Sequence, residues 1–92
     1  MRSEVLVYPG MSGWRFLVLP KKQSEEIKKT FGKHARGWGS LRVSVTVGKT
    51  EWKTSIFPDK KSASYILPLK AQVRKAEDIA DDDTVQFSIK MQ

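Results

Sequence analysis

The clearest pattern in the chain is the alternation of apolar and polar residues over positions 41–47, LRVSVTV. A period of two is typical of a strand with one buried face. Gly48 and Lys49 then suit a two-residue hairpin turn with glycine at its first central position. This turn sets a register that keeps apolar partners on one face, and a shift by one residue would break it. The predicted pairs are Val47 with Thr50, Thr46 with Glu51, Val45 with Trp52, Ser44 with Lys53, and Leu41 with Ile56.

Four further segments have the composition of strands. They are short runs rich in β-branched, aromatic and aliphatic residues, at positions 4–8, 14–19, 64–69 and 84–91. Both faces of the segment 14–19 are largely apolar, so we expect it to be covered on both sides. Pro68 stands near the end of its segment, which indicates an edge strand or the point where the chain leaves the sheet.

Two short helices are predicted, one at residues 24–29 and one at 70–77. Ser24 is placed to cap the first helix, and Gly32 is placed to end it. About six strands and two short helices without a repeat or linker indicate one mainly β domain over residues 1–92. We expect a small, closed or partly closed β-barrel, whose modest size would make a homodimer advantageous.

Composition excludes several kinds of site. The chain has no cysteine, which rules out disulfides, thiol nucleophiles and zinc–thiolate centres. Its one histidine, His34, has no acidic residue within four positions, and no nucleophile elbow or phosphate-binding glycine motif occurs. The acidic run 81–83 lacks the spacing of a calcium loop and is interpreted as a solvated turn. We therefore expect no enzyme activity, no metal and no cofactor.

The chain shows no sign of secretion or membrane insertion. Its first residues lack the pattern of a signal peptide, and no apolar run approaches the roughly 20 residues that span a bilayer. We expect a cytoplasmic protein that does not enter a membrane.

The net charge of +7 is unevenly distributed. Residues 15–61 contain twelve Lys and Arg against four acids, whereas residues 77–83 contain five acids and no base. A positive field of this kind favours an anionic partner, with nucleic acid first among the candidates. It is equally consistent with a charge that only keeps the protein in solution.

The best candidate for a nucleic-acid site is the glycine-rich loop 32–40 together with the hairpin. Four cations would neutralise phosphates, and the indole of Trp38 would stack on a base. The four cations are Lys33, Arg36, Arg42 and Lys53. In the alternative interpretation, Trp38 packs into the end of the barrel and the cations form an ordinary solvated surface.

The second candidate function is that of an accessory module that binds a small ligand or a protein partner. Trp14, Trp52 and Phe57 would line an apolar cavity beside the strands that carry them. Aromatic residues at alternate strand positions are more often plain core, so this alternative stays open beside the first.

Several phrases, in order along nearly the whole chain, resemble the domain-of-unknown-function family numbered 1905. They are residues 14–20 (WRFLVLP), 37–39 (GWG), 43–48, 52–58 (WKTSIFP), 65–70 and 73–76 (VRKA). The resemblance implies a double-split β-barrel, a fold shared with AbrB- and MazE-like DNA-binding proteins. It implies no activity, so Trp14 and Arg74 are motif residues without an assigned role.

The chain departs from this family before its last strand. The family usually has Gly-Asp where this chain has Asp82-Asp83. A glycine there typically serves a turn with positive φ, a conformation that aspartate tolerates less well. The turn geometry at this position is therefore open.

Overall fold

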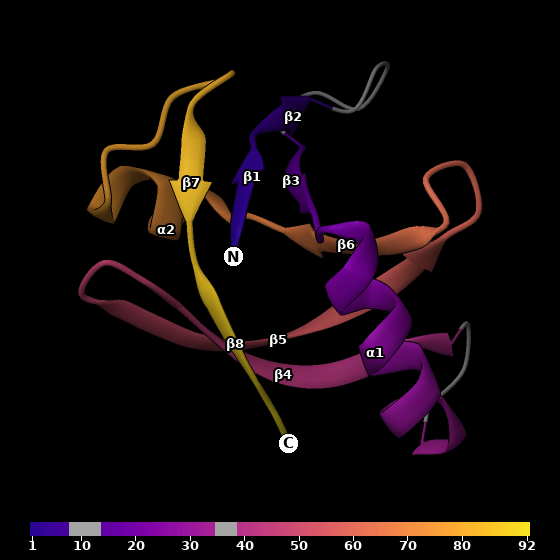
Figure 1. The fold of residues 1–92 in the computed structure, drawn as a ribbon. Coiled ribbons are helices and arrows are strands. Elements are labelled where there is room, and N and C mark those ends of the chain that lie inside the picture. Colours follow the sequence, from indigo (N-terminus) through magenta and orange to yellow (C-terminus); the bar gives the residue numbers. More distant parts are fainter. Residues whose placement is uncertain (8–13, 35–38) are drawn as a thin grey trace.

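The computed structural model describes residues 1–7, 14–34 and 39–92, and its described part is mainly β with two α-helices (Figure 1). In chain order, its elements are β1 (Arg2–Glu4), β2 (Leu6–Val7), β3 (Arg15–Val18), α1 (Lys21–Phe31), the 3₁₀ turn η1 (Gly32–His34), β4 (Leu41–Val47), β5 (Thr50–Asp59), β6 (Ser64–Pro68), α2 (Ala71–Ala76), β7 (Thr84–Gln86) and β8 (Ser88–Met91). The predicted fold class is confirmed at this level.

The described strands form two antiparallel sheets. One has six strands in the order β2-β3-β6-β5-β4-β8, and the other pairs β1 with β7. Only Val5 separates β1 from β2, and only Phe87 separates β7 from β8, so both terminal strands run from one sheet into the other. The sheets are open in this arrangement, and the closed barrel expected from the sequence is not confirmed.

The hairpin of β4 and β5 has the predicted register at every pair. Val45 faces Trp52, Ser44 faces Lys53, and Leu41 faces Ile56. Gly48 has a φ of +56°, the left-handed conformation that the first central position of this turn requires. Figure 1 shows this hairpin as a long curved ribbon, with α1 beside one end of it.

The core lies on the inner face of this curved sheet. Leu41, Val43, Val45 and Val47 alternate into it from β4, and Ile56, Leu17 and Leu67 are fully buried opposite them. Val5 and Phe87 are also buried, although each interrupts its strand. Their amides are bonded to the carbonyls of Asp83 and Met1, so the interruptions leave no backbone donor unsatisfied.

The first helix begins earlier than predicted, and the assignment of Ser24 as its cap is wrong. Pro20 precedes α1 with extended ψ, and Ser24 lies inside the helix, where it is 2% exposed. Its Oγ accepts a hydrogen bond of 3.0 Å from the Tyr65 amide of β6. This bond links the helix to the sheet, because the Ser24 side chain faces the strands and is shielded from solvent. Gly32 follows the last residue of α1, as expected.

Asp82 has a φ of +69°, so the turn before the last strand has the conformation that a glycine would favour. Because this conformation is strained in a residue with a β-carbon, Asp82→Gly is expected to raise the free energy of unfolding by about 0.5 kcal/mol. Ala80→Gly is the control, since Ala80 has no positive φ and the added chain entropy should destabilise the protein. Urea unfolding of both variants checks this, and a less stable Asp82→Gly protein would contradict it.

Candidate functional site

Three of the five residues predicted to contact nucleic acid lie in the described part of the chain, and all three are exposed. Lys33 lies in η1, Arg42 in β4 and Lys53 in β5. Arg36 and Trp38 lie outside the described residues.

The structure brings Arg42 and Lys53 onto one face, the outward side of β4 and β5. Lys53 pairs with Ser44, and Ser44 pairs on its other side with Lys90 of β8. With strands about 4.8 Å apart, the α-carbons of the two lysines lie about 10 Å from each other. Arg42 is two residues from Ser44 along β4, about 7 Å. We call Arg42, Lys53 and Lys90 the basic sheet face.

The basic sheet face carries three positive charges that are open to solvent. All three side chains are exposed, and none forms an ion pair with any residue that the structure describes. Glu51 lies on the same side of β5 as Lys53 and faces Thr46, and Asp59 stands at the far end of the strand opposite Ser64. Lys33 lies in η1, at the end of α1, and therefore belongs to a different element from the three strands of this face.

Lys90 was not among the sequence candidates. The alternation of residues 84–91 turns it outward, opposite in direction to Ile89, and this much could have been inferred. However, β8 lies beside β4 through long-range strand pairing, which no local pattern reveals.

Two of the three aromatic residues predicted to line a cavity lie in the same groove. Trp14 and Trp52 line one groove of about 350 Å³, with Leu69 of the β6–α2 connection. We call this the Trp groove; its other lining residues are Arg15, Thr54, Pro68, Lys70, Ala71 and Arg74. Phe57 pairs with Ile66 and does not line it. Trp52 is only 8% exposed, so it belongs to the core as well as to the groove.

An ion pair stands at the edge of the Trp groove. The Arg15 guanidinium donates from Nε to Oδ1 of Asp81 at 2.9 Å and from Nη2 to Oδ2 at 3.0 Å. The hydrogen bonds from Arg15, with a further contribution from the charge of Arg74, hold the pKa of Asp81 below its usual value. The carboxylate is therefore ionised at neutral pH. Arg74 itself donates from Nε to the Leu69 carbonyl at 3.2 Å.

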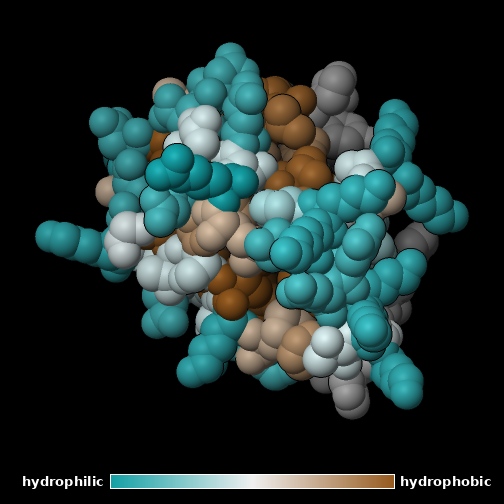
Figure 2. Space-filling view, viewed as in Figure 1, coloured by the Kyte–Doolittle hydropathy of each residue, from teal (hydrophilic) through white to brown (hydrophobic). Residues whose placement is uncertain are grey.

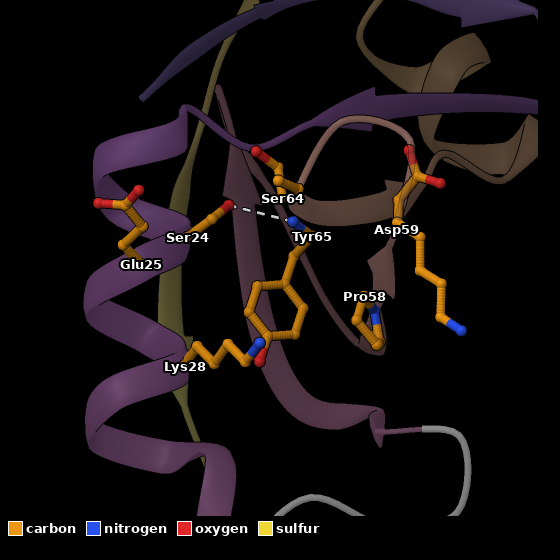
Figure 3. A pocket seen from close by; sticks show the side chains of 9 residues that line it. Ser24, Glu25, Lys28, Pro58, Asp59, Ser64 and Tyr65 are labelled. Carbon is orange, nitrogen blue, oxygen red and sulfur yellow. Dashed lines mark hydrogen bonds between the residues drawn. The ribbon is translucent and has the colours of Figure 1, made fainter.

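A second hollow of about 350 Å³ lies between α1 and the turn from β5 to β6 (Figure 3). Its floor is the Tyr65 ring, whose burial raises the pKa of the hydroxyl. Two of the polar groups around it are bonded within the fold: Ser24 accepts from the Tyr65 amide, and the Asp59 carboxylate accepts from Ser62 Oγ at 2.8 Å. This hollow is a consequence of how the helix meets the turn.

Two kinds of feature are absent from the described residues. No group of three or more His, Asp or Glu side chains there is arranged to hold a metal ion. No helix there is both long enough and apolar enough to cross a membrane.

Figure 2 shows that hydrophilic side chains cover much of the molecular face that it presents. An apolar patch lies over the position of β2 in Figure 1. Leu6 and Val7 of that strand are 39% and 43% exposed. Part of the edge strand β2 is therefore exposed apolar surface, and it contains none of the predicted site residues.

Comparison with known families gives one match. The family model described as "Domain of unknown function (DUF1905)" matches residues 2–89. No curated protein matches the chain.

Proposed function

Because the chain belongs to the family described as Domain of unknown function (DUF1905), we propose its function from its own surface: it is a small, non-enzymatic domain that binds nucleic acid through the basic sheet face. We also propose that its two sheets close into one ring, the double-split barrel that the family resemblance implies. The continuity of β1 with β2, and of β7 with β8, supports closure, since each pair of strands joins both sheets.

The observation that carries the proposal is the row across β5, β4 and β8. Three strands each contribute one exposed cation, and the pairing of the strands fixes the spacing of these cations. Because the α-carbons of the cations lie about 8 to 10 Å apart on a sheet, each can contact a separate phosphate without a rearrangement of the backbone. No described element covers this face, so a polyanion has access to it.

Phosphate contact alone predicts binding without sequence preference. Ser44, Ser55 and Gln92 are neutral neighbours of the cations on this face; the serines lack the bidentate geometry that reads a base, and the Gln92 amide is already bonded to Ser44 Oγ at 3.3 Å. Binding of this type releases counterions and weakens steeply as salt rises. The proposed activity is therefore weak at physiological salt and independent of sequence.

The net charge offers a competing explanation, because exposed lysines occur on many elements. They include Lys21, Lys22, Lys28 and Lys29 of α1, Lys49, Lys60 and Lys61 of the turns, and Lys70 and Lys75 around α2. Removal of three charges from any place would weaken a purely non-specific attraction. The test therefore has to distinguish the effect of where the charges lie from the effect of the total charge on the affinity for nucleic acid.

Two matched triple variants make this separation. Arg42→Gln/Lys53→Gln/Lys90→Gln removes the basic sheet face, and Lys22→Gln/Lys29→Gln/Lys61→Gln removes the same charge from α1 and a turn. Fluorescence anisotropy with labelled single-stranded and duplex oligonucleotides at about 50 mM salt measures the affinity, and a salt series gives the slope.

The sheet-face variant is expected to bind roughly tenfold more weakly or worse, with a slope of log K against log salt smaller by about 2 to 3. The control variant should lose much less affinity and keep the slope to within about 1. Equal losses in the two variants would show that total charge, and not this face, attracts the nucleic acid. Absence of binding by the wild-type protein at low salt would reject the function itself.

A further inference from the structure

One edge of β8 is not covered by another strand. Among the strands that the structure describes, β8 is the last in the order of its sheet, and β4 is its neighbour there. The Gln92 amide bonds to the Arg42 carbonyl, and hydrogen-bonded pairs alternate along an antiparallel ladder. Ile89 and Met91 therefore direct their N–H and C=O groups away from β4, and no described residue bonds to these groups. We call these four backbone groups the open edge.

The neighbouring part of the same edge already pairs with β1. The Phe87 amide donates to the Met1 carbonyl at 2.8 Å, and the Phe87 carbonyl accepts from the Met1 amino nitrogen at 2.7 Å. Because backbone directions repeat every two residues, Ile89 and Met91 face the same side of the strand as Phe87. The described pairing with β1 stops at Phe87. The open edge is therefore available for one more antiparallel strand, whether or not the two sheets close into a ring.

An apolar groove of about 260 Å³ lies beside the open edge, between β8 and α1. Most of its lining side chains are apolar, namely Met1, Ile27, Phe31, Ile89 and Met91. Its other lining residues are Gln23, Glu26 and Thr30 of α1. The volume is below the usual range for a small-molecule site, which starts at about 300 Å³. It suits the side chains of an added strand, because residues opposite Ile89 and Met91 would point to the same face as these two.

We propose that the open edge and this groove bind an extended segment of another protein, which adds to β8 as an antiparallel strand. The segment has apolar side chains at two alternate positions and a carboxylate between them. In recognition of this kind, backbone hydrogen bonds supply affinity and the pockets for alternate side chains supply specificity. The inference goes beyond nucleic-acid binding and does not rest on it, although Lys90 belongs to both surfaces.

Lys90 is the reason for the carboxylate. It stands between Ile89 and Met91 in β8, and its side chain is exposed on the outward face of the strand. It forms no ion pair with a described residue. Opposite charges on directly facing residues of an antiparallel pair stabilise the pair. An acidic residue opposite Lys90 therefore complements the edge, and Arg42 of β4 adds charge of the same sign nearby.

A second copy of this chain does not complement the open edge. The antiparallel register that bonds all four groups pairs Ile89 of each copy with Met91 of the other. Its central pair is then Lys90 against Lys90, at a position where the two α-carbons are only about 4.5 Å apart. Like charges that face each other directly destabilise a ladder, and a lysine on an edge strand protects against such self-pairing. The occupant is therefore a different chain.

The probe is a blocked peptide, acetyl-Thr-Ile-Glu-Ile-Thr-amide, whose isoleucines face the groove when its glutamate lies opposite Lys90. A nuclear magnetic resonance titration of the isotope-labelled protein measures the affinity at about 150 mM salt, which screens diffuse attraction to other lysines. The largest shifts are expected at the amides of Ile89 and Met91. Their hydrogen exchange should slow at saturation, because both N–H groups gain acceptors. The side-chain signals of Ile27 and Phe31 should also shift.

Two N-methylated peptides test the backbone bonds on the wild-type protein. Methylation of the first isoleucine amide removes a donor to the open edge and is expected to weaken binding about tenfold. Methylation of the glutamate amide is the matched control, because this amide points away from β8 in the proposed register. It should change the affinity by less than about twofold. Equal losses for the two peptides would overturn the inference.

An exchange of charges tests the carboxylate. A peptide with lysine in place of the glutamate should bind the wild-type protein about fivefold more weakly, and Lys90→Glu should reverse this preference. Lys53→Glu is the matched control, because it makes the same change on the same face, two strands away from the open edge. It should keep the preference for the glutamate peptide. Both lysines are exposed, and circular dichroism verifies that each variant is folded.

Three further results would contradict the inference. Unshifted amides of Ile89 and Met91 on addition of the glutamate peptide would leave Lys90 as the protection of an edge that nothing covers. A preference for glutamate that survives Lys90→Glu would reject the proposed pairing. Exchange of the two amides that slows as the protein concentration rises would make a second copy the occupant. None of these measurements contains nucleic acid, so their failure is separate from a failure of the proposed function.

Discussion

Ile56→Ala is expected to lower the free energy of unfolding by about 3 kcal/mol, a large share of the stability of a domain of this size. The Ile56 side chain is fully buried and pairs with Leu41 across the hairpin. It lies in β5, which has β4 on one side and β6 on the other, so the cavity left by three missing carbons cannot collapse easily. Urea unfolding followed by tryptophan fluorescence measures the change.

Two variants of β5 serve as controls for this result. Ile56→Val removes a single methylene and should cost about 1 kcal/mol. Ser55→Ala lies next to it on the outward face and should change the stability by no more than about 0.5 kcal/mol. A loss below about 1 kcal/mol for Ile56→Ala would show that the inner face of this hairpin is not the centre of the core.

Gly48→Val is expected to lower the free energy of unfolding by about 2 to 3 kcal/mol. Gly48 has a φ of +56°, which a β-branched residue adopts only with strain. A β-carbon at Gly48 would also collide with the Glu77 carboxylate. That carboxylate accepts a hydrogen bond of 2.6 Å from Thr50 Oγ1, so its displacement would break a bond between the hairpin and the end of α2.

A double-mutant cycle separates the two causes. Glu77→Ala should cost less stability in the Gly48→Val background than in the wild-type protein, because it removes the collision there. Lys49→Ala, at the neighbouring turn position without positive φ, should stay within about 0.5 kcal/mol of the wild type. Equal effects of Glu77→Ala in both backgrounds would mean that the collision contributes nothing and that the backbone conformation accounts for the whole loss.

The hairpin could be predicted in detail because its determinants are local. The alternation over residues 41–47 defines the buried face, and Gly48 fixes the turn, so the pairing follows from arithmetic. The turn at Asp82 was left open by the sequence, and the positive φ of Asp82 shows that it keeps the conformation that the glycine of the family would favour. Pro68 is the last residue of β6, which agrees with its expected place where the chain leaves the sheet.

Tertiary contacts determine what the sequence did not reveal. A serine before two glutamates is typical of a helix cap. Ser24 instead faces β6, where its Oγ accepts a hydrogen bond from the Tyr65 amide. The two interruptions of the terminal strands, at Val5 and Phe87, depend on strands that meet only after the whole chain is folded. Apolar patterning shows that these residues are buried and does not show that the strand changes sheets there.

The candidate sites also combine features that local sequence patterns predict with features that depend on long-range contacts. The outward direction of Arg42 and Lys53 follows from the hairpin pattern, and the structure places both side chains as expected. Lys90 joins them only because β8 pairs with β4. The Trp groove depends on three segments distant in sequence, β3, β5 and the start of α2, so its grouping of Trp14 with Arg74 could not be derived from spacing.

The most direct test of the proposed function is a nuclear magnetic resonance titration of the wild-type protein with a single-stranded oligonucleotide at low salt. The proposal predicts chemical-shift changes that are concentrated at the amides of the outward residues of β4, β5 and β8, around Arg42, Lys53 and Lys90, and that disappear as salt is raised. Shifts spread over the lysines of α1 and the turns, or no shifts on the basic sheet face, would contradict it.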